Sequence, residues 1–271
     1  MPSEPLGQPK LAYVRPVQPL FFPEQEPEHE RLGQNPRHYD LCRLLYEVLG
    51  RLVHDAGHGV SCDMFLYWDA KNPRECRAPD AALKLGLAQT DLVTHLSWKT
   101  WELGVPELVV EVLSLSDTRE RWTLDEKRDA YERIGVGELV VFDLDRPEGD
   151  RLRIWDRVDG DFVERVVREE RAPCVTLSRA MGGLVEWRVA PIHQYPVGLR
   201  LLHDAAVVPT DHERAESAIT ASAAARADRD AARGEADVAR ADRDAARGEA
   251  DAARARVAEL ERELAARPAK T

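Results

Sequence analysis

The segment from Gly104 to Asp145 constrains the fold more than any other part of the chain. It holds two apolar runs, ELVVEVLS and ELVVFDLD, on either side of the helical pattern TLDEKRDAYERIGV, which stops near Gly135. Short apolar runs bounded by turn residues are typical of buried β-strands. The segment therefore predicts a strand, a helix and a second strand, with the second strand inside a protein core.

Further patterns between residues 36 and 200 place this unit in a larger domain. Leucines and valines at helical spacing in RHYDLCRLLYEVLGRLVHDA predict an amphipathic helix of about five turns. DMFLYW and the residues from about Asp80 onward are predicted strands, and RLRIWDRV, the turn Asp159–Gly160 and DFVERVV predict a β-hairpin. Short strands are also expected in CVTLS and LVEWRV. The order of helix, three strands, helix and strand predicts a mixed α/β domain rather than a regular βαβ array.

Glu111 lies in the middle of the strand pattern ELVVEVLS. An ionised carboxylate costs several kcal/mol to bury unless a cation meets it. Two interpretations follow from this cost. Either the strand lies at the edge of a sheet and Glu111 faces water, or a cation lies beside the carboxylate.

Asp80, which follows Pro79, and Lys127, on the helix after the glutamate strand, are two further residues that suggest chemistry. If the strands of Asp80 and Glu111 are neighbours, both carboxylates can face one point, and the helix can bring Lys127 there. Two carboxylates suit a hard divalent cation, usually Mg²⁺, which polarises a phosphate and activates a bound water. A lysine neutralises the charge that develops on the phosphoryl oxygens. Taken singly, the three residues are also explained by a turn, an edge strand and a solvated helix face.

The composition changes after about residue 209, where Ala, Arg, Asp and Glu dominate. Thr210 and Glu213 form a T-x-x-E capping box, which predicts the start of a helix. The stretch ADRDAARGEADVAR (227–240) recurs as ADRDAARGEADAAR (241–254), a repeat of two heptads, and apolar residues at coiled-coil spacing follow it. This tail is either an oligomerisation stalk or a helix solvated along its length.

Composition disfavours several classes of protein. No apolar run of about 18 residues is present, and residues 1–33 form a Pro-rich lead-in without the pattern of a secretory signal. The cysteines show no CxxC pair and no zinc-ligand spacing, so we expect buried, reduced thiols and a cytoplasmic location. They are Cys42, Cys62, Cys76 and Cys174. The net charge of −11 disfavours a general nucleic-acid coat, but an active site needs only a local positive field.

Four stretches of the chain resemble one known family. They are NPRHYDLCRLLYEVL, FLYWDAKNPRECRAPD, GVPELVVEVLSLS and DEKRDAYERIGVGELVVFDLD, within the segment from about Gln34 to Asp145. By these stretches the chain resembles the Uma-two family, a group of restriction-endonuclease-like proteins in the PD-(D/E)XK nuclease superfamily. The resemblance implies a restriction-endonuclease-like mixed β-sheet flanked by helices, an endonuclease activity that depends on Mg²⁺ or Mn²⁺, and DNA as the substrate.

The resemblance also implies roles for the residues discussed above. Asp80 matches the acid of the "PD" element and Glu111 the acid of the "(D/E)XK" element, so these two would bind the metal. The lysine of the standard motif is replaced here by Leu113. In this family the lysine role shifts to the following helix, which makes Lys127 the third catalytic candidate.

Three further residues are candidates for supporting roles by the same resemblance. Glu107 stands in a "PEL" sequence where relatives have "PDL". Relatives often carry an acid early in the first helical region, and at that place this chain offers Gln34 or, less directly, Glu47.

The sequence thus predicts a lead-in at residues 1–33, a nuclease-like domain at residues 34–205 and a helical tail at residues 209–271. The first functional hypothesis is a metal-dependent DNA endonuclease. The alternative is a nuclease-fold protein with little or no activity that serves as a binding or assembly module through its tail. In both cases we expect no membrane segment, and the tail is a candidate for homo-oligomer formation.

Overall fold

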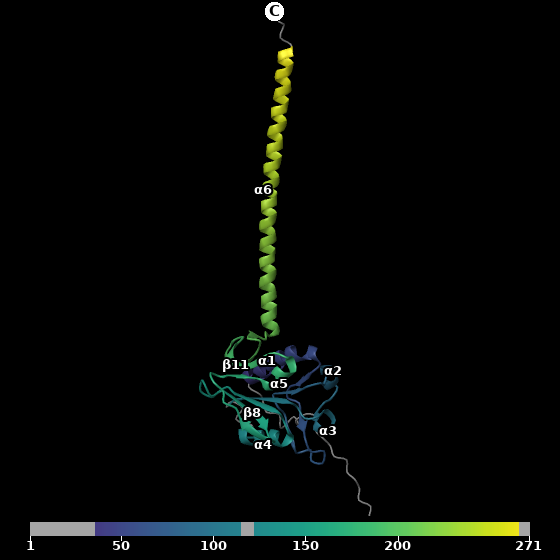
Figure 1. The fold of residues 1–271 in the computed structure, drawn as a ribbon, viewed down its shortest axis with the longest axis vertical. Helices are drawn as coiled ribbons and strands as arrows, with labels where there is room; N and C mark the ends of the chain where they lie inside the picture. Colours follow the sequence, from purple (N-terminus) through teal and green to yellow (C-terminus); the bar gives the residue numbers. More distant parts are fainter. Residues whose placement is uncertain (1–35, 115–121, 266–271) are drawn as a thin grey trace, which may run out of the picture. The chain divides into compact units, whose positions relative to one another are not determined.

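The computed structural model describes residues 36–114 and 122–265 and divides the chain into two compact units. The first unit ends at Thr210 and the second begins at Asp211. The first unit is a mixed α/β domain, which confirms the fold class predicted from the order of the sequence patterns (Figure 1). The second is the single helix α6 (Asp211–Ala265).

A six-stranded mixed sheet forms the centre of the first unit. Its strands lie in the order β1 (Gly59–Ser61), β4 (Ala81–Lys84), β6 (Leu108–Leu113), β7 (Glu138–Asp143), β8 (Leu152–Val158) and β9 (Asp161–Glu164). Strands β6 and β7 are parallel, and the other neighbouring pairs are antiparallel. The two apolar runs that flank the predicted helix are therefore adjacent central strands. Since β6 is not an edge strand, Glu111 does not face water at an edge.

The two faces of the central sheet pack against different helices. Helix α1 (Pro36–Val53) covers one face, where its buried leucines share a core with β6 residues such as Val110. Helix α4, which connects β6 to β7, covers the other face, where Tyr131 packs with Val109. Figure 1 shows α1 and α4 on opposite sides of the sheet. Because side chains alternate along a strand, Glu111 points to the same face as Val109, toward α4.

Two smaller sheets and several short helices complete the first unit. The strands of one sheet have the order β10 (Arg171–Pro173), β11 (Val185–Ile192), β12 (Tyr195–His203) and β13 (Ala206–Val207), and those of the other have the order β3 (Cys76–Arg77), β2 (Leu66–Tyr67) and β5 (Trp98–Lys99). The short helices are η1 (His54–Ala56), α2 (Gln89–Leu92), α3 (Thr100–Leu103) and α5 (Val175–Met181). The sequence patterns did not predict β1, β3, β5, β10, β12 or β13, most of which are short.

Local signals explain where α4 and the predicted hairpin begin and end. Helix α4 (Leu124–Ile134) starts with a capping box in which Thr123 and Glu126 bond each other's backbone N–H groups. It ends at Gly135, whose φ of +97° lies in the region that favours glycine. The hairpin is formed by β8 and β9, and its turn residues Asp159 and Gly160 both have positive φ, as a type I′ turn requires.

The prediction of a strand in CVTLS is wrong, because these residues begin helix α5. The cause is a contact from strand β7. The buried carboxylate of Glu138 accepts hydrogen bonds from the backbone N–H groups of Val175 at 3.3 Å and Thr176 at 2.8 Å. First-turn N–H groups have no partner inside a helix, and a carboxylate there is favoured by the helix dipole. This tertiary contact overrides the strand preference of the β-branched residues.

Helix α6 begins directly after Thr210, where the capping box predicts a helix. Its side chains from Arg214 to Arg262 are exposed, and nearest-neighbour ion pairs such as Arg240–Asp237 at 3.2 Å lie along it. Exposed pairs at this spacing add only about 0.2–0.5 kcal/mol each to helix stability. Within the described ranges, no helix combines the length and the apolar composition needed to cross a bilayer. The predicted lead-in at residues 1–33 lies outside the described residues.

Candidate active site

The start of β4 and the middle of β6 bring Asp80 and Glu111 together. The two strands pair antiparallel with Ala81 opposite Val110, so the residue before Ala81 is aligned with the residue after Val110. Asp80 and Glu111 are therefore opposite one another across the strand pair. Both are buried, with 6% and 1% of their surface exposed. The charge of Asp80 reaches Glu111, but the two carboxylates have different partners, Asp80 on helix α1 and Glu111 on helix α4.

Helix α4 supplies the groups that contact the carboxylate of Glu111. Lys127 Nζ lies 2.5 Å from Glu111 Oε2, and the Tyr131 hydroxyl donates a hydrogen bond to Glu111 Oε1. Lys127 and Tyr131 are four residues apart on the helix and so lie on the same face. The cation that the sequence reasoning expected beside Glu111 is thus the ammonium group of Lys127, which is itself buried.

The charges around Glu111 shift its pKa. The pKa of the Glu111 carboxyl is raised from 4.5 to about 7, chiefly by burial and in smaller part by the nearby charge of Asp80. The attraction of Lys127 and the hydrogen bonds from Lys127 and Tyr131 act in the opposite direction and do not fully offset burial. The pKa of Tyr131 is raised as well, by its own burial and by the charge of Glu111. The buried ammonium group of Lys127 thus contacts Glu111, whose carboxylate also lies within the field of Asp80.

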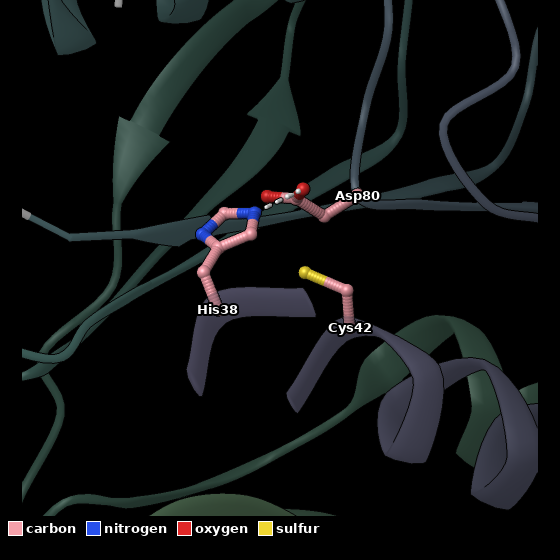
Figure 2. A group of neighbouring side chains, drawn as sticks. All are labelled: His38, Cys42 and Asp80. Carbon is pink, nitrogen blue, oxygen red and sulfur yellow. Dashed lines mark hydrogen bonds and ion pairs between the residues drawn. The ribbon is translucent and has the colours of Figure 1, made fainter. Parts of the chain in front are cut away.

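Asp80 has a second set of partners on the α1 side of the sheet (Figure 2). Its Oδ1 lies 3.1 Å from His38 Nε2, and its Oδ2 accepts a hydrogen bond of 2.6 Å from the backbone N–H of Val112. Cys42 lies one helical turn after His38, and the ligand atoms of His38, Cys42 and Asp80 are all within 4.8 Å of one another. Figure 2 shows the imidazole and the thiol projecting from α1 toward the Asp80 carboxylate.

The three residues of this group are all buried, and the environment acts on the thiol in one direction. Burial, followed by the charge of Asp80, raises the pKa of the Cys42 thiol above its ordinary value. The thiol is therefore protonated at neutral pH as long as no cation displaces the proton. The four cysteines are free of disulfides, as predicted, and Cys42 and Cys174 are fully buried.

A buried arginine, Arg77, lies near Tyr131 of helix α4. Arg77 on β3 is 8% exposed, and its guanidinium carbon lies 3.8 Å from the ring centre of Trp122 and 5.6 Å from that of Trp68. Burial lowers the pKa of Arg77, and the nearby phenol of Tyr131 partly offsets this. The indole faces stabilise the cation in this dry position.

Two of the three supporting candidates from the sequence, Glu107 and Glu47, bind other partners. Glu107 lies just before strand β6, where its carboxylate accepts hydrogen bonds from Lys84 Nζ at 2.6 Å and from the backbone N–H of Leu85 at 2.8 Å. Glu47 lies on α1, where its carboxylate is 3.7 Å from Arg43. Glu47 is not among the residues that converge on Asp80. Gln34 lies outside the described residues.

Sequence reasoning missed three residues that the fold brings to the site: His38, Cys42 and Tyr131. The signal for the first two was present, because His38 and Cys42 are four residues apart within the predicted helix RHYDLCRLLYEVLGRLVHDA. A search for spacing among the cysteines alone does not find a pair that consists of a cysteine and a histidine. Tyr131 is likewise four residues after Lys127 in a predicted helix.

The donor groups at this point fit a divalent cation. Two carboxylates from neighbouring strands are buried together, and their mutual repulsion contributes to the raised pKa of Glu111. A cation between them relieves this repulsion and offsets the cost of their desolvation. The imidazole and thiol beside Asp80 add nitrogen and sulfur donors to the oxygen donors of the two acids.

The chain matches the model of a known protein family. A family model described as "Uma2: Putative restriction endonuclease" matches residues 30–189. A solved structure, described as a "putative nuclease belonging to DUF820" from Anabaena variabilis, is 10% identical in sequence. The match covers 60% of this chain and 75% of the chain in that structure, with a TM-score of 0.37. No curated protein matches the chain.

Proposed function

The chain belongs to the Uma2 family of restriction-endonuclease-like proteins, and from this premise we propose that it is a metal-dependent endonuclease that hydrolyses phosphodiester bonds in DNA. The observation that carries the proposal is the convergence of Asp80, Glu111 and Lys127. Register across β4 and β6 aligns the acids, and α4 places the lysine 2.5 Å from the second acid. Carboxylates beside a lysine are the groups that phosphodiester hydrolysis needs.

Each of these residues has a part that its contacts support. Asp80 and Glu111 would hold the divalent ion, Mg²⁺ or Mn²⁺, which supplies polarisation of the phosphate and a bound water of lowered pKa. Lys127 would neutralise charge on the phosphoryl oxygens, because its ammonium group is already positioned at the carboxylate. Tyr131 would hold the Glu111 carboxylate in one orientation through its hydroxyl.

The usual lysine two residues after the glutamate is Leu113 in this chain, and α4 offers the substitute. Leu113 ends strand β6, and Lys127 enters the site from the first turns of the next helix. Both positions can serve one point, because α4 packs on the face of β6 to which Glu111 points. We therefore assign the charge-stabilising role to Lys127.

Helix α6 supports a second candidate function, assembly. Its exposed apolar residues, among them Val238, Val257 and Leu260, lie on a helix of 55 residues that is otherwise polar and Ala-rich. Val257 and Leu260 are three residues apart, the spacing from an a to a d position of a heptad, and a helix with such a seam can pair with a second copy. On this basis the chain would form a homo-oligomer through α6, with or without nuclease activity. Light scattering of the full chain and of its Leu260→Glu variant measures this, since paired helices dissociate when a charge enters the seam.

The nuclease proposal is tested by cleavage of supercoiled plasmid and single-stranded DNA with Mg²⁺ or Mn²⁺. The variants are Glu111→Gln, Lys127→Met and, as a matched control at the residue just before β6, Glu107→Gln. We expect the first two to lower the rate by about 10²-fold or more, as loss of one charge-stabilising group does in other enzymes. Glu107→Gln should retain activity because Glu107 is bound to Lys84, away from the site. Equal background cutting by the wild type and Glu111→Gln would reject the proposal.

A further inference from the structure

The group on the α1 side of the site has the donor set of a transition-metal ion. We propose that His38 Nε2, Cys42 Sγ and one Asp80 carboxylate oxygen bind a single Zn²⁺-class ion at this point. The inference rests on the proposed function in one respect, because Asp80 is shared with the proposed nuclease centre. It goes beyond that function by assigning two new ligands and by changing the class of metal.

The geometry requires little movement to form such a site. His38 and Cys42 are four residues apart on α1 and therefore project from one face of the helix. Asp80 Oδ1 is already 3.1 Å from His38 Nε2, and all three ligand atoms are within 4.8 Å of one another. Tetrahedral zinc with bonds of about 2.0–2.3 Å holds its ligands roughly 3.5 Å apart. The thiol needs to approach the other two atoms by only about 1 Å.

The chemistry of the donors selects the metal. Mg²⁺ prefers oxygen ligands in a near-octahedral arrangement and retains several waters. An imidazole and a thiol beside one carboxylate suit Zn²⁺, Co²⁺ or similar ions instead. Three protein ligands leave one coordination position open, which distinguishes catalytic zinc sites from closed structural ones. Binding must also release the proton of the Cys42 thiol, because the thiolate is the ligand.

The position in the fold supports a site rather than a chance contact. The three side chains come from two elements, α1 and the start of β4, that pack across the same core. All three are buried, at 7%, 2% and 6% exposure for His38, Cys42 and Asp80. A hydrogen bond between His38 and Asp80 accounts for two of the three groups by itself. The Cys42 thiol lies beside the same carboxylate and interacts with it, so a third donor of a different element is already directed at Asp80.

The test uses the full-length protein, stripped of metal with a chelator and titrated with Co²⁺. Thiolate ligation to Co²⁺ produces a charge-transfer band in the near ultraviolet, which aspartate and histidine ligands do not produce. We expect this band at one equivalent of Co²⁺ in the wild type and its displacement by Zn²⁺. The band should be absent in Cys42→Ser. It should persist in the control Cys76→Ser, because Cys76 lies on β3 outside the group.

A second variant guards against a folding defect in Cys42→Ser, which replaces a core residue. His38→Gln keeps the thiol, and its affinity for Zn²⁺, measured by calorimetry, should fall by more than about 10-fold. Loss of a residue that only supports a ligand already costs about that much, and His38 is proposed as a ligand itself. Far-ultraviolet circular dichroism checks that each variant is folded. No band in the wild type would overturn the inference. So would a band that survives Cys42→Ser but disappears in Cys62→Ser.

These measurements separate the inference from the proposed function. Mg²⁺-dependent cleavage of DNA by a protein that gives no cobalt–thiolate band supports the nuclease and overturns the zinc-class site. A band without cleavage under any metal supports the site and overturns the nuclease. Both results together support an enzyme whose centre extends from Glu111 to α1.

Discussion

Replacing Glu111 by glutamine should change how the stability of the protein depends on pH. The pKa of Glu111 is 4.5 in an unfolded chain and about 7 in the fold, where burial is the largest cause and Asp80 adds to it. The folded state therefore binds a proton between these pH values while the unfolded state does not. Stability from this group is fully present below pH 4.5 and is lost as the pH rises through 7.

The size of the effect follows from the shift. Over the window from pH 5 to pH 8, a carboxyl with these two pKa values lowers the free energy of unfolding by about 2 to 3 kcal/mol. Glutamine has nearly the same shape and does not titrate. The free energy of unfolding of Glu111→Gln should therefore fall less over this window than that of the wild type, by the same amount.

Urea denaturation of the full chain with a chelator present, at pH 5, 6, 7 and 8, measures the difference. The matched control is Glu126→Gln on α4. The pKa of Glu126 is lowered by hydrogen bonds from Thr123, so this group titrates below the window and its variant should run parallel to the wild type. If Glu111→Gln also runs parallel to the wild type, Glu111 does not have the raised pKa from which the argument starts.

Two other substitutions test the contacts that hold the site and the domain. Tyr131→Phe removes the hydroxyl that binds Glu111, so urea denaturation should show a loss of about 1–3 kcal/mol that is larger at pH 8 than at pH 5, where the carboxyl is protonated; a loss independent of pH would contradict this contact. Glu138→Ala removes the acceptor of the first N–H groups of α5 and one partner of Arg165, which keeps Asp156, and should cost about 3–5 kcal/mol by chemical denaturation. Asp237→Ala removes an exposed acid of α6 and should lower the free energy of unfolding by less than about 0.5 kcal/mol. Equal losses in Glu138→Ala and Asp237→Ala would refute the argument that burial determines the cost.

The sequence predicted those parts of the fold that depend on local patterns. The long amphipathic helix α1, the central strands β6 and β7, the helix between them and the hairpin of β8 and β9 all have strong periodicity or turn signals. The residues of α5 have no such local signal, because their conformation is determined by Glu138 on strand β7. Short strands such as β1 and β13 are defined by their pairing partners and carry too few residues for a pattern.

The candidate site divides in the same way. Asp80, Glu111 and Lys127 were proposed from their order in the chain, and the structure gives their surroundings. The spacing of His38 and Cys42 on the predicted helix was a weak signal, and only the packing of α1 against the start of β4 shows that both side chains lie beside Asp80. Residues that belong to a sequence motif can thus be proposed from the sequence, whereas residues brought together by tertiary packing cannot.

The hydrogen bond from the Val112 N–H to Asp80 Oδ2 ties the chemistry of the site to the integrity of the sheet. Paired residues of β4 and β6 end at Ala81 and Val110, so this side chain continues the ladder where the β4 backbone stops. Replacing Asp80 by alanine would therefore leave the buried Val112 N–H without its acceptor and lower the free energy of unfolding by about 1–3 kcal/mol. The same substitution would weaken the fold and any reaction at the site. A relative without catalytic activity would therefore still need a hydrogen-bond acceptor at this position. Asparagine would keep the acceptor for the Val112 N–H, and so the fold, while removing the charge that a metal ion requires.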